Sequence, residues 1–270
     1  MRLKDRVCVV TGGGSGIGEA ICRSYDREGA RVAIVDVDLA AAGRVAESLA
    51  CAIAVQCDVG DPAAVRRAFA DVIARFGHVD VLVNNAGIVG KDEYQRTLES
   101  RELQINELRE TGAIKTPLRA AVQLTDEQWR RMMAIHLDGT FYCTRAVLED
   151  MEKRGQGVIV NMSSINGIDG GLGNPHYAAA KAGILGFTRA VAKEVIAQGI
   201  RVNAVAPGFV DTPLRETIAA VIQRAQVAAT PIGRAATAEE IANAVLFLTT
   251  DESSYFVGQT LSPNGGYITR

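Results

Sequence analysis

The chain has 270 residues, of which 48% are hydrophobic and 22% are charged, which is enough to bury a large core in one or two domains. Its formal net charge of −2 provides no basic field for nucleic acid or for an anionic membrane. No apolar run approaches the roughly 18 residues that cross a bilayer. We therefore expect neither a nucleic-acid partner nor a membrane partner.

Cysteine and histidine usage indicates a reducing compartment and no metal. The 5 cysteines are scattered, without a C-x-x-C pair, as is typical of reduced thiols. His78, His136 and His176 are far apart and match no zinc spacing. The first apolar run is shorter than the core of a signal peptide and leads directly into a glycine turn. We expect a cytoplasmic protein with no metal site.

Six short β-branched runs predict strands at residues 6–10, 31–36, 52–58, 80–85, 157–163 and 200–207. Each run is continuous rather than alternating in polarity, as in parallel strands covered on both faces. Helical patterns such as residues 16–29 and 62–77 separate them. The repeat predicts one α/β domain over residues 1–270, a doubly wound parallel sheet with helices on both faces and its ligand at the carboxyl ends of the strands.

The segment VVTGGGSGIGEA, residues 9–20, predicts a strand, a glycine turn and a helix. Gly12, Gly16 and Gly18 have the spacing T-G-x-x-x-G-x-G. Glycine permits positive φ, the close approach of a pyrophosphate to the backbone and tight helix–strand contact, while the helix N-terminus supplies amide donors. A plain turn is the alternative, but the position after the first strand of a β-α-β unit favours a nucleotide site.

Two acidic residues follow the next two predicted strands. Asp36 lies about 20 residues beyond the glycines, where a carboxylate can accept hydrogen bonds from an adenosine ribose. Asp58 could face the adenine amino group. Each of them could instead be the N-cap of the helix that follows.

An insertion interrupts the pattern from Gly90 to Gln123. It is rich in charge and much longer than the usual loop of about 2–6 residues between a strand and a helix. Tyr94, Leu98, Ile105 and Leu108 fall near one helical stripe, which indicates an amphipathic helix. Because the insertion follows a strand, we expect it over the ligand edge of the sheet, as a substrate lid or as a helix that packs against a neighbouring subunit.

The segment NPHYAAAKAG, residues 174–183, places Tyr177 and Lys181 four residues apart in a run of alanines. Alanine favours a helix, so the two side chains lie on one face, one turn apart. Such a pair can be a half-buried ring beside a solvated ammonium. A cation within about 4–6 Å also favours the phenolate, typically by one to three pKa units, which brings a tyrosine toward the range of an acid/base catalyst.

TGGGSGIG, NNAG (Asn84 to Gly87), NMSS ahead of YAAAK, and PGFVDT occur in the order seen in the short-chain dehydrogenase/reductase family, whose fold is of the Rossmann type. The resemblance covers nearly the whole chain, including the tail GQTLSPNGGY. It implies an oxidoreductase that moves a hydride between a nicotinamide and a secondary alcohol or ketone. It also implies a homo-oligomer, most commonly a tetramer and next a dimer.

The resemblance assigns roles to particular residues. Tyr177 is implied as the acid/base, Lys181 as the group that lowers the tyrosine's pKa and holds the nicotinamide ribose, and Ser164 as the donor to the substrate oxygen, with Ser163 as the alternative. Thr212 is implied to bind the carboxamide and Val210 to offer a backbone contact. The remaining implied cofactor contacts are Ser15, Ile17, Val59, Asn85, Ala86, Gly87, Pro207 and Gly208.

One position departs from the family pattern. His136, in MMAIHLDGTF, aligns where the family usually has an asparagine that helps to hold a proton-relaying water. Histidine can hydrogen-bond a water and can titrate near neutral pH. A packing role and a catalytic role for His136 both remain open at this stage.

Asp36 and the absence of arginine at Ser15 or just after Asp36 favour NAD(H) over NADP(H), because the carboxylate would face the 2′-phosphate. A lid would favour a hydrophobic or cyclic alcohol or ketone. One alternative is a reductase of 3-oxoacyl thioesters, since GNPHYAAAKAG and PGFVDT resemble those enzymes, although they usually use NADPH and carry an arginine in the glycine loop. The other alternative is a nucleotide-binding regulatory protein without turnover.

Overall fold

The computed structural model describes residues 1–212 and 220–269, and the side chains of residues 91–94 and 221 lie outside that description. Seven strands form one sheet in the order β3-β2-β1-β4-β5-β6-β7, with every adjacent pair parallel. The strands are β1 (Val7–Thr11), β2 (Arg31–Asp36), β3 (Ala52–Gln56), β4 (Val81–Asn84), β5 (Gly157–Met162), β6 (Ile200–Val205) and β7 (Thr260–Leu261).

The predicted doubly wound parallel sheet is confirmed, and each of the six predicted strands is present. The chain order reverses beside β1, which pairs with β2 on one side and β4 on the other, so a crevice for a ligand is expected at the carboxyl ends of β1 and β4. Sequence reasoning missed β7, because two residues are too few to show a strand pattern.

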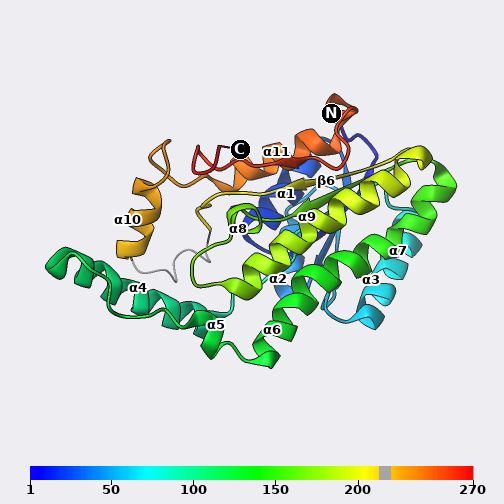
Figure 1. The fold of residues 1–270 in the computed structure, drawn as a ribbon. Coiled ribbons are helices and arrows are strands. Elements are labelled where there is room, and N and C mark those ends of the chain that lie inside the picture. The colour runs from blue at the N-terminus through cyan, green and yellow to red at the C-terminus, as the bar shows by residue number, and fades with distance from the viewer. Residues whose placement is uncertain (213–219, 270) are drawn as a thin grey trace.

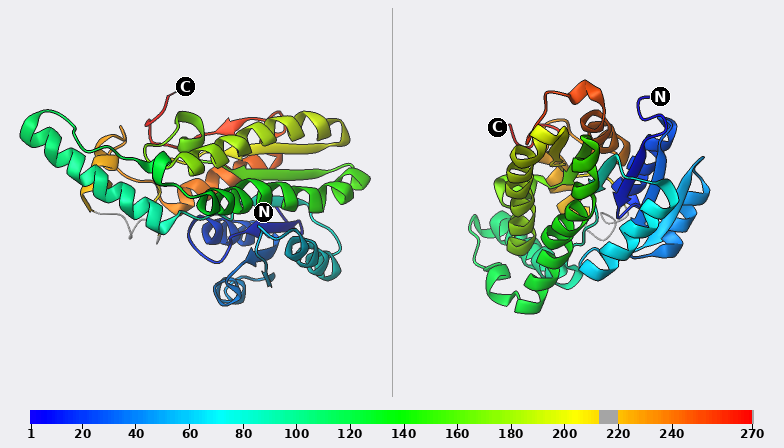
Figure 2. Two further views of the ribbon diagram at one scale, coloured as in Figure 1. Left: turned by 60° about the horizontal axis from the view of Figure 1, so that its bottom comes forward. Right: turned by 90° about the vertical axis from the view of Figure 1, so that its right-hand side faces the viewer.

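Helices cover both faces of the sheet (Figures 1 and 2). Side chains of β1 alternate between the two cores: Cys8 and Val10 pack with α1 and α11, whereas Val7 and Val9 pack with α3, α7 and α9. The α-helices are α1 (Gly16–Arg27), α2 (Leu39–Glu47), α3 (Pro62–Phe76), α4 (Lys91–Thr111), α5 (Ala120–Gln123), α6 (Asp126–Met133), α7 (Gly139–Arg154), α8 (Ile165–Asp169), α9 (Pro175–Val195), α10 (Ala220–Ala228) and α11 (Ala238–Thr249). The π-helix η1 (Ala134–Asp138) joins α6 to α7, and the short helices η2 (Ile196–Gln198) and η4 (Asp251–Ser253) complete the set.

The insertion forms the long helix α4 and the short helix α5. Figure 1 shows α4 projecting beyond the end of the sheet with α10 beside it, and the left view of Figure 2 shows the same projection. The helix ends at Gly112, whose φ of +72° is the left-handed conformation that glycine adopts readily. The predicted helix therefore exists and extends the molecule at the ligand edge of the sheet.

Within the described residues, no helix is both long enough and apolar enough to span a membrane. The same part of the chain holds no cluster of three or more His, Cys, Asp or Glu side chains suited to a metal ion. All five cysteines are free thiols, and Cys8, Cys22, Cys57 and Cys143 are buried. Burial raises the pKa of Cys57 to about 11, so this thiol stays protonated at neutral pH.

Candidate active site

The turn between β1 and α1 requires glycine for two separate reasons. Gly12 and Gly16 have φ of +64° and +56°, which side chains rarely adopt. A Cβ on Gly18 would lie 2.0 Å from the carbonyl oxygen of Gly12, so only glycine permits this contact between helix and strand. Ser15 is the N-cap residue of α1, and Ile17 in the first turn lines the main cavity of the protein. The start of α1 therefore borders that cavity through Ile17, whereas the glycines of the turn lie outside its lining.

Asp36 lies against the glycine turn. One carboxylate oxygen accepts a hydrogen bond from the Gly14 amide at 2.9 Å, and the other accepts from the Asp38 amide at 3.0 Å. The alternative that Asp36 caps the next helix is wrong, because Asp38 is the N-cap of α2 and accepts from the Ala41 amide. The carboxylate at the end of β2 is thus directed toward the glycine turn.

Asp58 is likewise not a helix cap. Its carboxylate accepts a hydrogen bond from the Gly60 amide at 2.8 Å, whereas Asp61 caps α3 by accepting from the Ala63 amide. The Asp58 side chain is exposed, and Val59 beside it is buried in the core at 6% exposure. Neither Asp58 nor Val59 lines the main cavity of the protein.

Asn85 joins the end of β4 to the glycine turn. Its side-chain amide donates to the carbonyl oxygens of Thr11 and Gly12 at 3.1 and 3.0 Å. The backbone amides of Asn85 and Ala86 in turn donate to the Thr11 hydroxyl. This reciprocal set holds NNAG beside the turn and leaves Asn85 and Gly87 lining the cavity.

A buried polar network beneath the site escaped the sequence reasoning. The Asn84 amide donates to Asn161 at 2.8 Å and to the Thr144 hydroxyl at 3.0 Å, and the Asn161 amide donates to Thr188 at 2.9 Å. It links β4, β5, α7 and α9 just behind the cavity. Asparagines within continuous apolar strands were the available signal, because a buried amide needs partners.

Tyr177 and Lys181 lie one turn apart on α9 and both line the cavity. The Lys181 ammonium lies 5.7 Å from the centre of the Tyr177 ring and donates to the Met162 carbonyl oxygen at 2.7 Å. Lys181 is only 4% exposed, and burial lowers its pKa from 10.5 to about 7. The alternative of a solvated ammonium is therefore wrong.

The two neighbouring serines differ in what their hydroxyls do. Ser163 is buried, and its hydroxyl donates to the Lys181 carbonyl oxygen at 2.8 Å, which binds β5 to α9. Ser164 is the N-cap of α8, where its hydroxyl oxygen accepts from the Asn166 amide at 3.1 Å. Accepting that bond leaves the Ser164 proton available to donate into the cavity, so the geometry favours Ser164 over Ser163 as the donor to a substrate.

His136 lies in the π-helix η1, edge-on to the Tyr177 ring with 5.4 Å between ring centres. Its Nε2 lies 2.9 Å from the Ile88 carbonyl oxygen and 3.0 Å from the Ile88 amide. Burial, together with the positive charge of Lys181, lowers the pKa of His136 to about 3. The imidazole is therefore neutral at physiological pH, and its ring supports both Tyr177 and the segment after NNAG.

Four of the predicted nicotinamide contacts follow β6 and line the cavity: Pro207, Gly208, Val210 and Thr212. A β-bridge pairs Val210 with Ala236. The Ala236 amide donates to the Phe209 carbonyl oxygen, and the Asp211 amide donates to the Ala236 carbonyl oxygen. These two bonds do not use the backbone amide and carbonyl of Val210, which leaves both groups for a contact with a ligand. The Thr212 methyl would lie 3.7 Å from a Cβ on Gly16, so this segment closes over the glycine turn.

Eleven of the predicted site residues line one cavity of about 550 Å³, a volume within the usual range for small-molecule sites: Ile17, Asn85, Gly87, His136, Ser164, Tyr177, Lys181, Pro207, Gly208, Val210 and Thr212. The others lie outside its lining: Gly12, Ser15, Gly16, Gly18, Asp36, Asp58, Val59 and Ala86. The outer end of the cavity is formed by two helices. Helix α4 contributes Thr97, Leu98, Arg101 and Ile105, and α10 contributes Ile222, Ala225 and Gln226. The insertion thus contributes one face of α4 to the lining of the cavity.

The predicted apolar stripe on α4 is only partly correct. Leu98 is buried and Ile105 lines the cavity, but Leu108 is 53% exposed and lies outside the lining. At 100° per residue, Leu108 is rotated by about 80° from Leu98, so the two cannot share one narrow face. The side chain of Tyr94 lies outside the described residues.

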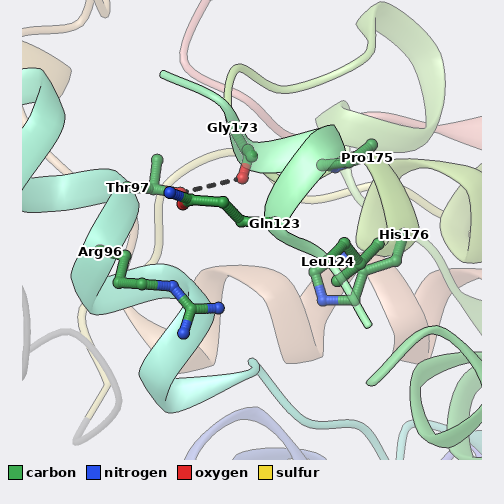
Figure 3. A pocket seen from close by; sticks show the side chains of 8 residues that line it. Arg96, Thr97, Gln123, Leu124, Gly173, Pro175 and His176 are labelled. Carbon is green, nitrogen blue, oxygen red and sulfur yellow. Dashed lines mark hydrogen bonds between the residues drawn. The ribbon is translucent and has the colours of Figure 1, made fainter. Parts of the chain in front are cut away.

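A hydrogen bond anchors α4 to the loop before the tyrosine helix. The Thr97 hydroxyl donates to the Gly173 carbonyl oxygen at 3.1 Å (Figure 3). Gly173 has a φ of +82°, and a Cβ there would lie 2.2 Å from the Thr97 methyl group. Figure 3 shows this contact beside a far smaller cavity of about 10 Å³ between α4, α5 and the start of α9.

A parallel sheet with a glycine turn after β1, and a serine, tyrosine and lysine on one cavity, defines a nucleotide-binding oxidoreductase of the Rossmann type. The family model for short chain dehydrogenase matches residues 6–222, and the chain belongs to that family. It is therefore an oxidoreductase that acts on CH–OH and C=O groups with a nicotinamide dinucleotide, NAD or NADP.

The chain is similar to several named proteins along nearly their whole length. A 3-oxoacyl-[acyl-carrier-protein] reductase of Thermotoga maritima is 36% identical, over 99% of this chain and 100% of the relative. A cis-4-hydroxycyclohexanecarboxylate dehydrogenase of Sinomonas cyclohexanicum is 40% identical, over 97% of this chain and 96% of the relative. The crystal structure of gox2181 superimposes with a TM-score of 0.84 at 32% identity, covering 98% of this chain and 96% of the other.

Proposed function

We propose that the protein is an NAD(H)-dependent oxidoreductase that interconverts a hydrophobic or cyclic secondary alcohol and its ketone. The observation that carries this proposal is that Ser164, Tyr177 and Lys181 line one cavity, which Ile17 at the start of α1 also lines. A bound nicotinamide dinucleotide supplies or accepts the hydride. In oxidation, the alcohol carbon loses its hydride to the dinucleotide and the hydroxyl loses its proton, so that a C=O bond forms.

The chain's own groups then have distinct tasks. Tyr177 takes the hydroxyl proton in oxidation and returns it in reduction. Ser164 donates a hydrogen bond to the reacting oxygen, which stabilises the negative charge that develops there. Lys181 when charged favours the phenolate of Tyr177 through space, and the neutral His136 holds the tyrosine ring in place.

The residues at the carboxyl ends of β1 and β2 fit NAD better than NADP. Asp36 presents a carboxylate beside Gly14, where it can accept hydrogen bonds from a ribose, and Val37 and Asp38 follow it. Like charges about 4 Å apart at an effective dielectric of about 20 repel by roughly 4 kcal/mol. After screening by solvent, we expect about a 100-fold preference for NAD(H), at about 1.4 kcal/mol per tenfold.

The cavity also supports the choice of substrate. Leu98, Ile105, Leu172 and Phe209 line it, and its volume of about 550 Å³ would accommodate a ring. The cyclic substrate in the name of the Sinomonas relative agrees with this choice, whereas the Thermotoga relative favours a 3-oxoacyl thioester as the second candidate.

We also infer a cytoplasmic homo-oligomer, tetrameric or dimeric. Phe141 on α7 is 41% exposed and packs edge-on against Phe187 of α9, with 6.2 Å between ring centres. An exposed ring that packs on a half-buried one is the kind of feature that subunit interfaces bury.

One panel tests the proposal. Initial rates would be measured for cyclic secondary alcohols, their ketones and a 3-oxoacyl thioester, each with NAD(H) and NADP(H). We expect the highest kcat/KM for a cyclic alcohol or ketone with NAD(H). Equal or better use of NADP(H) would refute the cofactor assignment, and a preference for the thioester would support the second candidate. Dinucleotide binding without any turnover would instead indicate a regulatory protein.

A further inference from the structure

Arg101 brings a positive charge to the outer end of the cavity. It lies on α4 with three other lining residues, Thr97, Leu98 and Ile105. At 100° per residue these four positions fall within an arc of about 100°, so they form one face of the helix. That face is turned toward the cavity that also holds Tyr177.

No side chain that the structure describes on the helix neutralises Arg101. The positions three and four residues away are Leu98, Thr97, Gln104 and Ile105, none of which is charged. Among the described residues, no carboxylate forms an ion pair with Arg101, and the lining of the cavity contains no Asp or Glu. By contrast, Arg154 and Arg234 elsewhere in the protein each pair with an acid.

The guanidinium is held in place from one side. Its Nη1 donates to the Gln104 side-chain oxygen at 3.0 Å, and the Gln104 amide donates to the Thr116 carbonyl oxygen at 2.7 Å. Gln104 is only 6% exposed, so this support is buried and ordered by its own partner. A guanidinium has five N–H donors in a planar fork, and one bond to Gln104 leaves donors for a second group.

Among the described lining residues, the other cation is Lys181, and it cannot serve the same purpose. Lys181 is buried and its ammonium is bound to the Met162 carbonyl oxygen, close to the Tyr177 ring. The lining otherwise consists of apolar and neutral polar side chains, which strengthen the attraction between Arg101 and an anion.

We propose that Arg101 binds a carboxylate on the substrate, so that the protein acts on a hydroxy acid or keto acid whose reacting carbon is remote from its acid group. This inference rests on the proposed function, since it places the reacting alcohol at Tyr177. The planar carboxylate matches the fork of the guanidinium, and the apolar side chains that line the same cavity, such as Leu98 and Ile105, would cover the carbon frame of the substrate.

The test compares two substrates of the same shape, 4-hydroxycyclohexanecarboxylate and 4-hydroxycyclohexanecarboxamide, with NAD⁺ as oxidant. A hydrogen bond to a charged group makes the acid the better substrate by roughly 10- to 100-fold in kcat/KM. In Arg101→Gln the ratio of acid to amide should fall toward one, mainly through KM, and Arg101→Lys should restore part of it. Arg109→Gln is the matched control, because it removes the same charge from an exposed position on the same helix.

Calorimetric binding of cyclohexanecarboxylate to the same four proteins gives a readout that does not depend on turnover, and thermal unfolding shows that each is folded. A wild-type protein that turns over the amide as well as the acid would overturn the inference while leaving the proposed function intact. So would an acid-to-amide ratio that Arg101→Gln leaves unchanged. The inference would also be overturned if Arg101→Gln lost kcat/KM only with a coenzyme A thioester as substrate. The anion bound by Arg101 would then be a phosphate of coenzyme A and not a carboxylate. Absence of turnover for every alcohol with both dinucleotides would refute the proposed function itself.

Discussion

Replacing Lys181 with methionine should stabilise the dinucleotide-free protein at low pH. The side chain is 4% exposed, and burial lowers its pKa from 10.5 to about 7. At about 1.4 kcal/mol per pKa unit, this difference between the unfolded and folded protein amounts to roughly 5 kcal/mol. Methionine has a similar length and no charge, so it removes this penalty at the loss of one hydrogen bond to Met162, worth about 1 kcal/mol.

The pH dependence gives the sharper measurement. Between pH 7 and pH 10.5 the unfolded chain holds a proton on Lys181 that the folded protein does not, so wild-type stability rises with pH in this window. From pH 6 to pH 9 the rise is about 3 kcal/mol. The free energy of unfolding of Lys181→Met lacks this rise. The amount by which the variant is more stable than wild type should therefore shrink by about 3 kcal/mol over the same interval.

Urea unfolding of both proteins at pH 6 and pH 9, without dinucleotide, measures this advantage. Lys193→Met is the control, because Lys193 is exposed on the same helix and should show no such change. A Lys181→Met protein that is less stable than wild type at pH 6, or whose advantage is equal at the two pH values, would refute the reasoning.

Three further predictions concern activity. Tyr177→Phe should retain fold and dinucleotide affinity but lose roughly 10²- to 10⁴-fold in kcat, as steady-state kinetics and fluorescence titration would show; near-normal turnover would mean that another group is the acid. His136→Asn should keep kcat within about tenfold of wild type, which corresponds to a change of at most about 1.4 kcal/mol in the activation free energy. Because the pKa of His136 is lowered to about 3, the wild-type pH–rate profile should show no histidine inflection near pH 6.5, and finding one that vanishes in His136→Asn would contradict the buried, neutral ring. Shortening residues 90–123 to a few residues should raise KM or change substrate preference with NAD affinity and oligomeric state retained; dissociation into smaller assemblies with unchanged preference would show an interface element instead of a lid.

Local constraints made much of the protein predictable from its sequence. The glycines after the first strand were recognisable because the constraint on them is steric and acts between residues close in sequence. A Cβ on Gly18, for example, would lie 2.0 Å from the carbonyl oxygen of Gly12. Tyr177 and Lys181 were predictable as neighbours because four residues make about one helical turn. Continuous apolar runs predicted six parallel strands, since strands buried on both faces must be apolar throughout.

Tertiary structure decided what depends on contacts between distant segments. Only the structure showed that the Asp38 side chain caps α2, by accepting from the Ala41 amide, while Asp36 packs on Gly14. The charge states of the site also follow from packing, because burial is the main cause of the lowered pKa of both Lys181 and His136. The rotation of α4 against the sheet places Arg101 in the cavity and leaves Leu108 exposed, and the periodicity of the helix alone does not determine which face will meet the rest of the chain.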